Sequence, residues 1–466
     1  MNPFSIVFAI VMFGLLIFIH ELGHFIAARI CGVRVLEFAI GMGPKILWKK
    51  SKKSGTVYSI RLFPLGGFVS MHGETGMETV QGDNGEEKSE KADDSRAFFA
   101  TEDISDEALF ERDTLEATTA PASDPDPHSY RNQSVWKRIF ISVAGPAMNI
   151  ILGFVLMLVV VLASGQNMGG TEVARFFVQY NAEESYAGLQ KDDLLYAVDG
   201  ERVFSFAEFK DKVAAKNGEA MELTVQRVNA EGTALIEPYP VLTVVLDVER
   251  LDEYFITSNS EVAGLKTGDK VLKVNRTPVH TADELSYELM QQGHKKLQVT
   301  VLRDGERVTV DDIFLPTIEE SGAVFGQMDF QVYREEFNFL SVMKHTFFRS
   351  VSTVKTVFDS ISGLFTQRYG IEAVSGPIGI TKVISDVVDT GVINLIYIVT
   401  VISINLGVMN LLPIPALDGG HLLIYAVEVV RRKPMNEKIE GIINAVGLIT
   451  MLALAVLIAI KDVITL

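Results

Sequence analysis

The sequence predicts a polytopic α-helical membrane protein with about four transmembrane helices and a β-hairpin. Two small α/β domains are predicted outside the membrane. Three observations lead to this fold class. The chain has 466 residues, 48% of them hydrophobic, and its mean hydropathy of +0.24 is high for a soluble protein. Its apolar residues are concentrated in four long runs. The polar region between the second and third runs contains an internal repeat, which indicates two copies of one module.

Four apolar runs are long enough to cross about 30 Å of hydrocarbon. They extend from Pro3 to about Ala28, from Ile139 to Ala163, from Val392 to about Val430 and from Ile439 to Ile460. Two prolines and two glycines interrupt the third run at 413–420. A cleaved signal peptide is the alternative for the first run. However, no Lys or Arg precedes that run, and it is longer than the apolar core of most signal peptides.

Basic residues beside these runs predict the orientation of the chain. Lys and Arg cluster after the first run, before the second run and between the last two runs. Because cytoplasmic loops carry the excess of Lys and Arg, we expect these segments in the cytoplasm. The N-terminus and the region from about 165 to 390 are then expected outside.

The segment after the first run predicts a β-hairpin and then an acidic insert. Strand-like stretches at Val35–Ile40 and Thr56–Phe63 flank a turn rich in Gly and Lys, within a first region at 1–73. From Glu74 to Asp126 the chain has 17 acidic and 4 basic residues, a balance of −13 out of −17 overall. With few apolar residues, the insert at 74–130 is predicted to be a disordered cytoplasmic loop, with an acidic docking tail as the alternative. The remaining chain is nearly neutral and has no long basic stripe, which excludes an electrostatic nucleic-acid binder.

The region that follows the second span (131–165) contains the repeat. Ala187-Gly188-Leu189 recurs as Ala263-Gly264-Leu265, and each copy continues with an aspartate, a helical stretch and an alternating strand. We predict two modules at 171–246 and 247–320 that resemble the bacterial form of the PDZ domain. Such domains bind an extended segment at a sheet edge, but modules that only block access sterically fit equally well. The mixed apolar and basic segment at Phe337–Phe365, within 336–390, predicts an amphipathic helix at the membrane surface.

The chemistry is concentrated in the sequence His20-Glu21-Leu22-Gly23-His24, at the end of the first run. Spacing of four residues places both imidazoles on one helix face, where they can bind a single zinc ion. Glu21 then lies beside the metal without being a ligand, as expected for a base that takes a proton from the attacking water and later passes it to the leaving amine. A centrally placed carboxylate costs about 2.5 kcal/mol or more in hydrocarbon, so such residues are usually functional. The alternative is a helix end whose polar side chains reach the interface.

A catalytic zinc normally has three protein ligands, so a third is required. Cys31 is the only cysteine, which excludes disulfides within the chain and thiolate zinc fingers and favours His and carboxylate ligands. Asp418, in the interrupted third run within 391–466, is the best candidate, because broken helices in membranes occur where protein or a water-filled cavity satisfies the backbone. Asp418 could instead cap the helix that follows it. His421 and Cys31 remain weaker candidates for the third ligand.

Together these motifs resemble the site-2 protease family of intramembrane zinc metalloproteases, and most closely its regulator of sigma-E protease group. The resemblance rests on the His20–His24 motif in a first span, on Leu417-Asp418-Gly419-Gly420 in a third span and on the two PDZ-like repeats between them. It covers nearly the whole chain, although the acidic insert is longer than the family leads us to expect.

The resemblance implies the roles of individual residues. His20, His24 and Asp418 would bind Zn2+, and Glu21 would be the general base. Asn405 and Asn410 would help to accommodate the substrate, although ordinary hydrogen bonds between helices are an alternative for both. The hairpin would be associated with the membrane near the active site. Independently of the resemblance, the amphipathic character of Phe337–Phe365 suggests that this helix is part of a substrate gate.

The resemblance also implies a function in regulated intramembrane proteolysis. The protein would be a multi-pass protein of the bacterial cytoplasmic membrane, in contact with lipid, with its metal motifs near the cytoplasmic side. Its substrates would be single-span membrane proteins, either anti-sigma factors or remnant signal peptides, usually after a first-site cut. The PDZ-like modules would exclude substrates that keep a bulky outer domain. A non-catalytic PDZ membrane scaffold and a metal transporter are alternatives, which the intact Glu21 and the single metal site disfavour.

Overall fold

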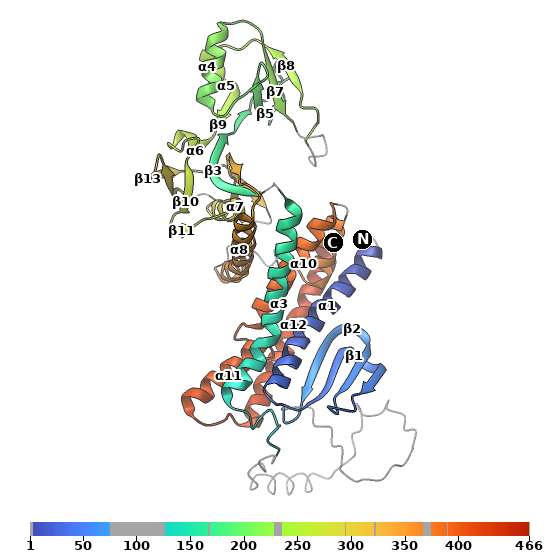
Figure 1. Ribbon diagram of the computed structural model, residues 1–466. Helices are drawn as coiled ribbons and strands as arrows, with labels where there is room; N and C mark the ends of the chain where they lie inside the picture. Colours follow the sequence, from blue (N-terminus) through green and yellow to red (C-terminus); the bar gives the residue numbers. More distant parts are fainter. Residues whose placement is uncertain are drawn as a thin grey trace. The chain divides into compact units, whose positions relative to one another are not determined.

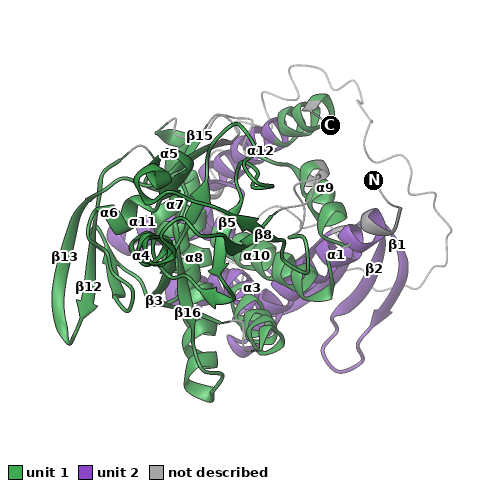
Figure 2. Ribbon diagram, turned by 90° about the horizontal axis from the view of Figure 1, so that it is seen from above, with its two compact units in different colours: residues 1–5, 150–408, 455–466 green, residues 6–149, 409–454 purple. Residues whose placement is uncertain are grey.

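The computed structural model describes residues 3–74, 126–165, 168–227, 235–293, 295–320, 323–366, 374–388 and 390–465. Most of the predicted acidic insert, residues 75–125, lies outside the described residues. The chain divides into two compact units (Figure 2), of which one contains 1–5, 150–408 and 455–466 and the other contains 6–149 and 409–454.

Four helices of the described chain are long and apolar enough to cross a membrane, as predicted (Figure 1). They are α1 (Pro3–Ile30), α3 (Val135–Ser164), α10 (Val392–Asn410) and α12 (Glu437–Thr465). The predicted third run is divided, because α10 ends at Asn410 and α11 (Asp418–Arg431) begins after the segment with the two prolines. These four helices fit the predicted polytopic α-helical membrane protein.

The segment for which a hairpin is predicted forms two antiparallel strands, β1 (Val35–Lys50) and β2 (Val57–Met71), and both are longer than the predicted stretches. Each strand bends, so the two strands form a sheet of four segments that lie side by side. The segment 35–40 pairs with 67–71 on one side and with 57–60 on the other, and 57–60 also pairs with 47–50. The bends lie where glycines adopt positive φ, such as 88° at Gly41 and 91° at Gly66, a conformation that disfavours side chains. The segment 67–71 thus becomes an edge of the sheet.

The region that contains the repeat has two six-stranded sheets and a separate two-stranded sheet in which β14 pairs with β15. The first has the order β8-β7-β5-β4-β9 and the second has the order β13-β12-β10-β3-β16. The first sheet domain consists of β4 (Val178–Tyr180), β5 (Leu194–Val198), β6 (Glu201–Arg202), α4 (Phe206–Lys216), β7 (Met221–Gln226), β8 (Val241–Val244), η1 (Val248–Arg250), α5 (Leu251–Tyr254) and β9 (Phe255–Thr257). The second consists of β3 (Gly169–Phe176), α6 (Asn259–Val262), β10 (Lys270–Val274), β11 (Thr277–Pro278), α7 (Ala282–Met290), β12 (Leu297–Arg303), β13 (Glu306–Ile313), β14 (Thr317–Glu320), β15 (Ala323–Gly326) and β16 (Phe330–Arg334).

The predicted boundaries at 171–246 and 247–320 differ from the strand pairing. Strand β3 lies in the range predicted for the first module, yet it pairs with β10 and β16 of the second sheet. Conversely, β9 lies in the second range and pairs with β4 of the first sheet. The repeat identifies the middle of each module, which both copies share, but it contains no information about which flanking strand joins which sheet.

A duplicated ion pair supports the internal repeat. Arg227 donates to both carboxylate oxygens of Asp193, at 2.7 and 2.6 Å, and to the Gly188 carbonyl at 2.8 Å. Arg303 makes the same three bonds to Asp269 and to the Gly264 carbonyl, at the same distances. Both aspartates are buried. The turn containing Gly-Leu is therefore tied to the last strand of the motif in the same way in each sheet domain.

Breaking this ion pair is expected to destabilise one sheet domain. Removal of one partner from a buried pair leaves the other charge uncompensated, which costs about 3–5 kcal/mol. Asp193→Ala should therefore accelerate hydrogen exchange throughout the first sheet domain. Lys210→Ala, which removes the exposed ion pair with Asp252, is the control and should leave exchange unchanged. Equal exchange in both variants would mean that the Arg227 pair contributes little to stability.

Helix α8 (Phe339–Phe365) covers the predicted amphipathic segment and is attached to α7 of the second sheet domain. Arg349 pairs with Asp283 at 2.9 Å, the Tyr287 hydroxyl donates to Asp359 at 3.0 Å, and Lys355 pairs with Glu288. Another side of α8 leaves large apolar side chains exposed, namely Leu340, Phe347, Val351, Phe358 and Phe365. These contacts fit an amphipathic helix, whose place at the membrane surface stays a prediction.

Helix α9 (Pro377–Val388) was not predicted as a separate element. Its first turn is capped by a residue far away in the sequence, because the backbone N–H groups of Gly376 and Gly379 both donate to Asp462 at 2.9 Å. A carboxylate at this position satisfies N–H groups that have no partner within the helix. The end of α12 is thus connected to the segment that precedes α10.

Candidate active site

Helix α1 presents His20, Glu21 and His24 in its C-terminal half. The helix is apolar through most of its length, and Gly23 allows it to approach α3 closely. A Cβ atom at Gly23 would lie 2.3 Å from the Ala144 carbonyl oxygen, which excludes any larger residue there without movement of one helix. The two histidines are both buried.

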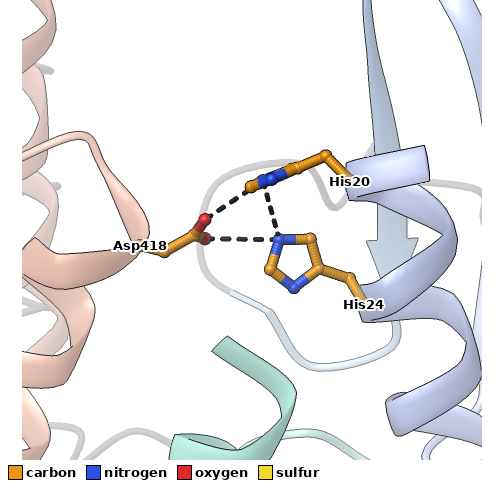
Figure 3. A group of neighbouring side chains, drawn as sticks. All are labelled: His20, His24 and Asp418. Carbon is orange, nitrogen blue, oxygen red and sulfur yellow. Dashed lines mark hydrogen bonds and ion pairs between the residues drawn. The ribbon is translucent and has the colours of Figure 1, made fainter. Parts of the chain in front are cut away.

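Asp418 meets the two histidines from the other end of the chain (Figure 3). His20 Nε2 lies 3.1 Å from Asp418 Oδ2, His24 Nε2 lies 3.4 Å from Asp418 Oδ1, and the two Nε2 atoms are 3.2 Å apart. Within the described chain these three residues form a group whose ligand atoms all lie within 4.8 Å of one another.

The separation of these atoms fits a zinc ion. Ligands about 2.0–2.1 Å from a tetrahedral zinc lie about 3.3 Å from one another. The observed distances of 3.1, 3.2 and 3.4 Å agree with this value, and two imidazole nitrogens with one carboxylate are a usual donor set. The second ring nitrogen of His24, Nδ1, lies 2.8 Å from the Ile141 carbonyl, which orients Nε2 toward the group.

Asp418 occupies the first position of α11, and the structure does not support a capping role for it. Leu417 is the N-cap residue, and no side chain makes a capping hydrogen bond there. The following glycines let the chain fold back tightly. A Cβ atom at Gly419 would lie 2.0 Å from the Leu412 carbonyl oxygen, and one at Gly420 would lie 2.5 Å from that of Ile414. This packing holds the Asp418 carboxylate next to the histidines.

Glu21 lies in the same cavity, which has a volume of about 440 Å³. It is close to the edge segment 67–71, since a Cβ atom at Gly67 would be 3.2 Å from Glu21 Cγ. Phe68, Val69 and Ser70 of that segment line the cavity as well. The cavity therefore brings a carboxylate, the His/Asp group and a sheet edge together.

The remaining residues singled out in the sequence do not all lie in this cavity. Asn410 lines the cavity, and its Nδ2 atom lies 3.5 Å from His20 Nδ1. Asn405 is exposed on α10 in the other compact unit, and its role stays a prediction. His421 lines the cavity but pairs with Glu440 at 3.6 Å, and the Cys31 thiol faces the Lys137 carbonyl at 4.0 Å. Neither belongs to the group formed by His20, His24 and Asp418.

Several residues that line the cavity were not predicted from the sequence. Tyr130 and Tyr425 are buried, and their hydroxyl groups are 2.7 Å apart. Tyr130 lies at the end of the segment predicted to be disordered, so this part of the prediction is wrong because it extends too far. Glu440 is a buried carboxylate at the start of the fourth span, and its position in an apolar run was a signal that could have identified it.

Gly145 provides a test of this geometry without a change to any polar side chain. A Cβ atom at Gly145 would lie 2.2 Å from His24 Nε2, so Gly145→Ala should displace the imidazole. We expect zinc affinity to fall about 10–100-fold, the range seen when ligand orientation is disturbed. Gly441→Ala is the matched control, because nothing lies within 4 Å of the added methyl group. The measurement is zinc retention during dialysis against a chelator, and equal retention by both variants would contradict the position of His24.

Comparison with known proteins defines the class to which this site belongs. The model of peptidase family M50, the site-2 proteases, matches residues 8–454. The chain therefore belongs to this family, and it is a zinc metalloprotease and a multi-pass membrane protein.

Individual relatives match along almost their entire length. The regulator of sigma-W protease RasP of Bacillus subtilis is 28% identical, with 98% of each chain covered. The zinc metalloprotease RasP of Bacillus licheniformis is 27% identical over 98% of each chain, and the regulator of sigma E protease of Haemophilus influenzae is 26% identical over 97% of each. The resemblance inferred from the motifs is confirmed.

Proposed function

We propose that this zinc protease cleaves single-span membrane proteins within the membrane after another protease has removed most of their outer domain. Anti-sigma factors and remnant signal peptides are the proposed substrates. The observation that carries the proposal is the group of His20, His24 and Asp418 with Glu21 in the same cavity, between apolar elements long enough to span a membrane. The names of two relatives as regulators of sigma factors support a regulatory output.

Within this site, His20, His24 and Asp418 are proposed to hold the zinc. When bound, zinc polarises the attacking water and the scissile carbonyl group. Glu21 takes the proton of the attacking water and passes it to the leaving amine. The Ile141 carbonyl keeps the His24 ring oriented, and Asn410 is placed to do the same for His20.

A peptide bond in a helical substrate must first be unwound, because helical hydrogen bonds shield its carbonyl group. The segment 67–71 pairs with 35–40 on one side, and among the described strands its other side has no partner. Such an edge can supply backbone hydrogen bonds to an extended substrate. Asn410 and Asn405 are proposed to pair with substrate backbone groups that lose their helical partners.

Selection of substrates is assigned to the two sheet domains. We propose that they are PDZ-like, lie outside the membrane and exclude substrates with bulky outer domains, while the metal site lies near the cytoplasmic side. The attachment of α8 to the second sheet domain makes α8 a candidate gate that moves with that domain.

The proposal is tested with two substrates that share one transmembrane segment. One keeps a folded outer domain and the other ends a few residues outside the segment. The protein, reconstituted in vesicles with zinc, should cleave only the shortened substrate. Cleavage of both would contradict selection by size, and cleavage of neither by a zinc-loaded protein would contradict the proposed substrate class.

A further inference from the structure

A second cavity lies on the compact unit that contains α1, between that helix and one face of the β1–β2 sheet. It has a volume of about 540 Å³, within the roughly 300–1,000 Å³ typical of ligand sites. Its lining is almost entirely apolar, and the one charged residue in it is Lys49. The lining residues are Phe18, Leu22, Phe25, Phe38, Ile40, Leu47, Trp48, Lys49, Tyr58, Ser59 and Ile60. We call this cavity the α1–sheet groove.

The base of the groove is a cluster of aromatic rings. The Phe38 ring centroid lies 5.8 Å from that of Phe18 and 5.2 Å from that of Phe25, and the Phe25 and Tyr58 centroids are 6.0 Å apart. The outer wall is exposed, since Leu47, Trp48 and Ile60 keep 63%, 67% and 48% of their surface accessible. An apolar groove of this kind on a helix that spans a membrane is suited to an acyl chain rather than to water.

Positive charge is concentrated at one end of the groove. Lys49, Lys50, Lys52 and Lys53 are all exposed, and no carboxylate of the described residues lies within 4.0 Å of their ammonium groups. Lys45, in contrast, pairs with Glu37 at 3.0 Å. These four residues, the lysine rim, lie at the turn between β1 and β2, and beside this turn the Thr56 hydroxyl donates to the carbonyl of Val35, the first residue of β1, at 2.9 Å.

The order of side chains along the strands matches the polarity of a membrane interface. The lysine rim is followed by Trp48 and Tyr58, then by the exposed apolar residues Leu47 and Ile46, and then by Lys45, whose charge is paired with Glu37. Aromatic residues favour the level of the headgroups, and lysines favour anionic lipid surfaces. A strand advances about 3.3 Å per residue, so Lys50 of the rim and Leu47 of the groove are about 10 Å apart along β1.

We propose that the α1–sheet groove binds an anionic phospholipid of the surrounding membrane, with one acyl chain in the groove and the phosphate at the lysine rim. The bound lipid would hold the far side of the same sheet whose edge, 67–71, lies beside Glu21. The proposal does not depend on the identity of the protease substrate, and its test does not use cleavage.

Tryptophan fluorescence provides the test, because the chain has only two tryptophans, Trp48 in the groove and Trp136 on α3. In the Trp136→Phe variant, Trp48 reports the groove alone. The full-length zinc-loaded protein in detergent is titrated with phosphatidylglycerol or phosphatidylcholine that carries bromine in an acyl chain, which quenches a nearby indole. We expect half-maximal quenching at about tenfold less phosphatidylglycerol than phosphatidylcholine, given several lysines near one headgroup.

Variants distinguish a specific lipid site at the lysine rim from nonspecific attraction between the protein's positive charge and anionic lipid. Replacement of the four rim lysines by glutamine should abolish the preference, and replacement by arginine should keep it. Glutamine at Lys266, Lys270, Lys273 and Lys295, which are equally exposed in the second sheet domain, is the matched control and should leave the preference intact. Zinc content equal to that of the parent protein shows that each variant is folded.

Three results would overturn the proposal. The first is equal quenching by both lipids, and the second is a preference that survives the loss of the rim lysines. The third is displacement of the brominated lipid by a single-span peptide at equimolar amounts, which would make the groove a peptide site.

Discussion

Glu21→Gln is expected to reduce cleavage of a shortened single-span peptide by about 10²–10⁴-fold, the usual contribution of a general base. The glutamine amide has almost the same size as the carboxylate but cannot accept the proton of the attacking water. Because Glu21 lies outside the group formed by His20, His24 and Asp418, the variant should still bind one zinc. Product formation and zinc content are measured on the same purified sample.

Glu440→Gln is the matched control for this experiment. Glu440 is a buried carboxylate that lines the same cavity, but it pairs with His421 rather than facing the metal ligands. Its replacement removes the same charge and should retain most of the activity. If both variants lose activity equally, the loss results from removing a negative charge from the cavity, and Glu21 is not the base.

Asp418→Ala is expected to abolish both cleavage and stoichiometric zinc binding. The substitution leaves two imidazoles, fewer than the three protein ligands of a usual catalytic zinc site. Asn410→Ala serves as the comparison for zinc binding, because Asn410 lies 3.5 Å from His20 Nδ1 and would affect the zinc only through the orientation of that ring. Its effect on zinc affinity should stay within about 10–100-fold. The effect of Asp418→Ala should be larger.

Zinc retained by Asp418→Ala after dialysis against a chelator is the result that would contradict this assignment. His421 would then be the next candidate ligand, since it lines the same cavity. Zinc binding by a double variant of Asp418 and His421 would then decide between two explanations. Loss of zinc only in the double variant would mean that His421 replaces Asp418 as a ligand, and retention of zinc would mean that neither side chain is required.

The placement of His20 and His24 side by side can be predicted from the sequence because it is local geometry. A spacing of four residues places His20 and His24 on one helix face wherever the helix lies. The motif around Asp418 is also recognisable, because two prolines and two glycines in an apolar run need a special environment. The long-range part, the meeting of α1 and the start of α11, follows from the family resemblance rather than from periodicity.

Other features of the fold depend on pairings between distant segments, which local patterns do not encode. The bends at Gly41 and Gly66 turn a predicted hairpin into a wider sheet and create the edge beside Glu21. The exchange of β3 and β9 between the two sheets is similarly invisible in the repeat. The contact of Tyr130 with Tyr425 joins residues 295 positions apart, and nothing near Tyr130 in the sequence indicates it.

The most direct test of the central claim is the position of the cut. The zinc-loaded protein is reconstituted in vesicles with a shortened single-span substrate, and the scissile bond is identified by mass spectrometry of both products. A protease built around His20, His24, Asp418 and Glu21 within the spans should cut inside the hydrophobic segment, and a zinc chelator should stop the reaction. Cleavage only outside that segment, or cleavage that continues in the chelator, would contradict intramembrane zinc proteolysis at this site.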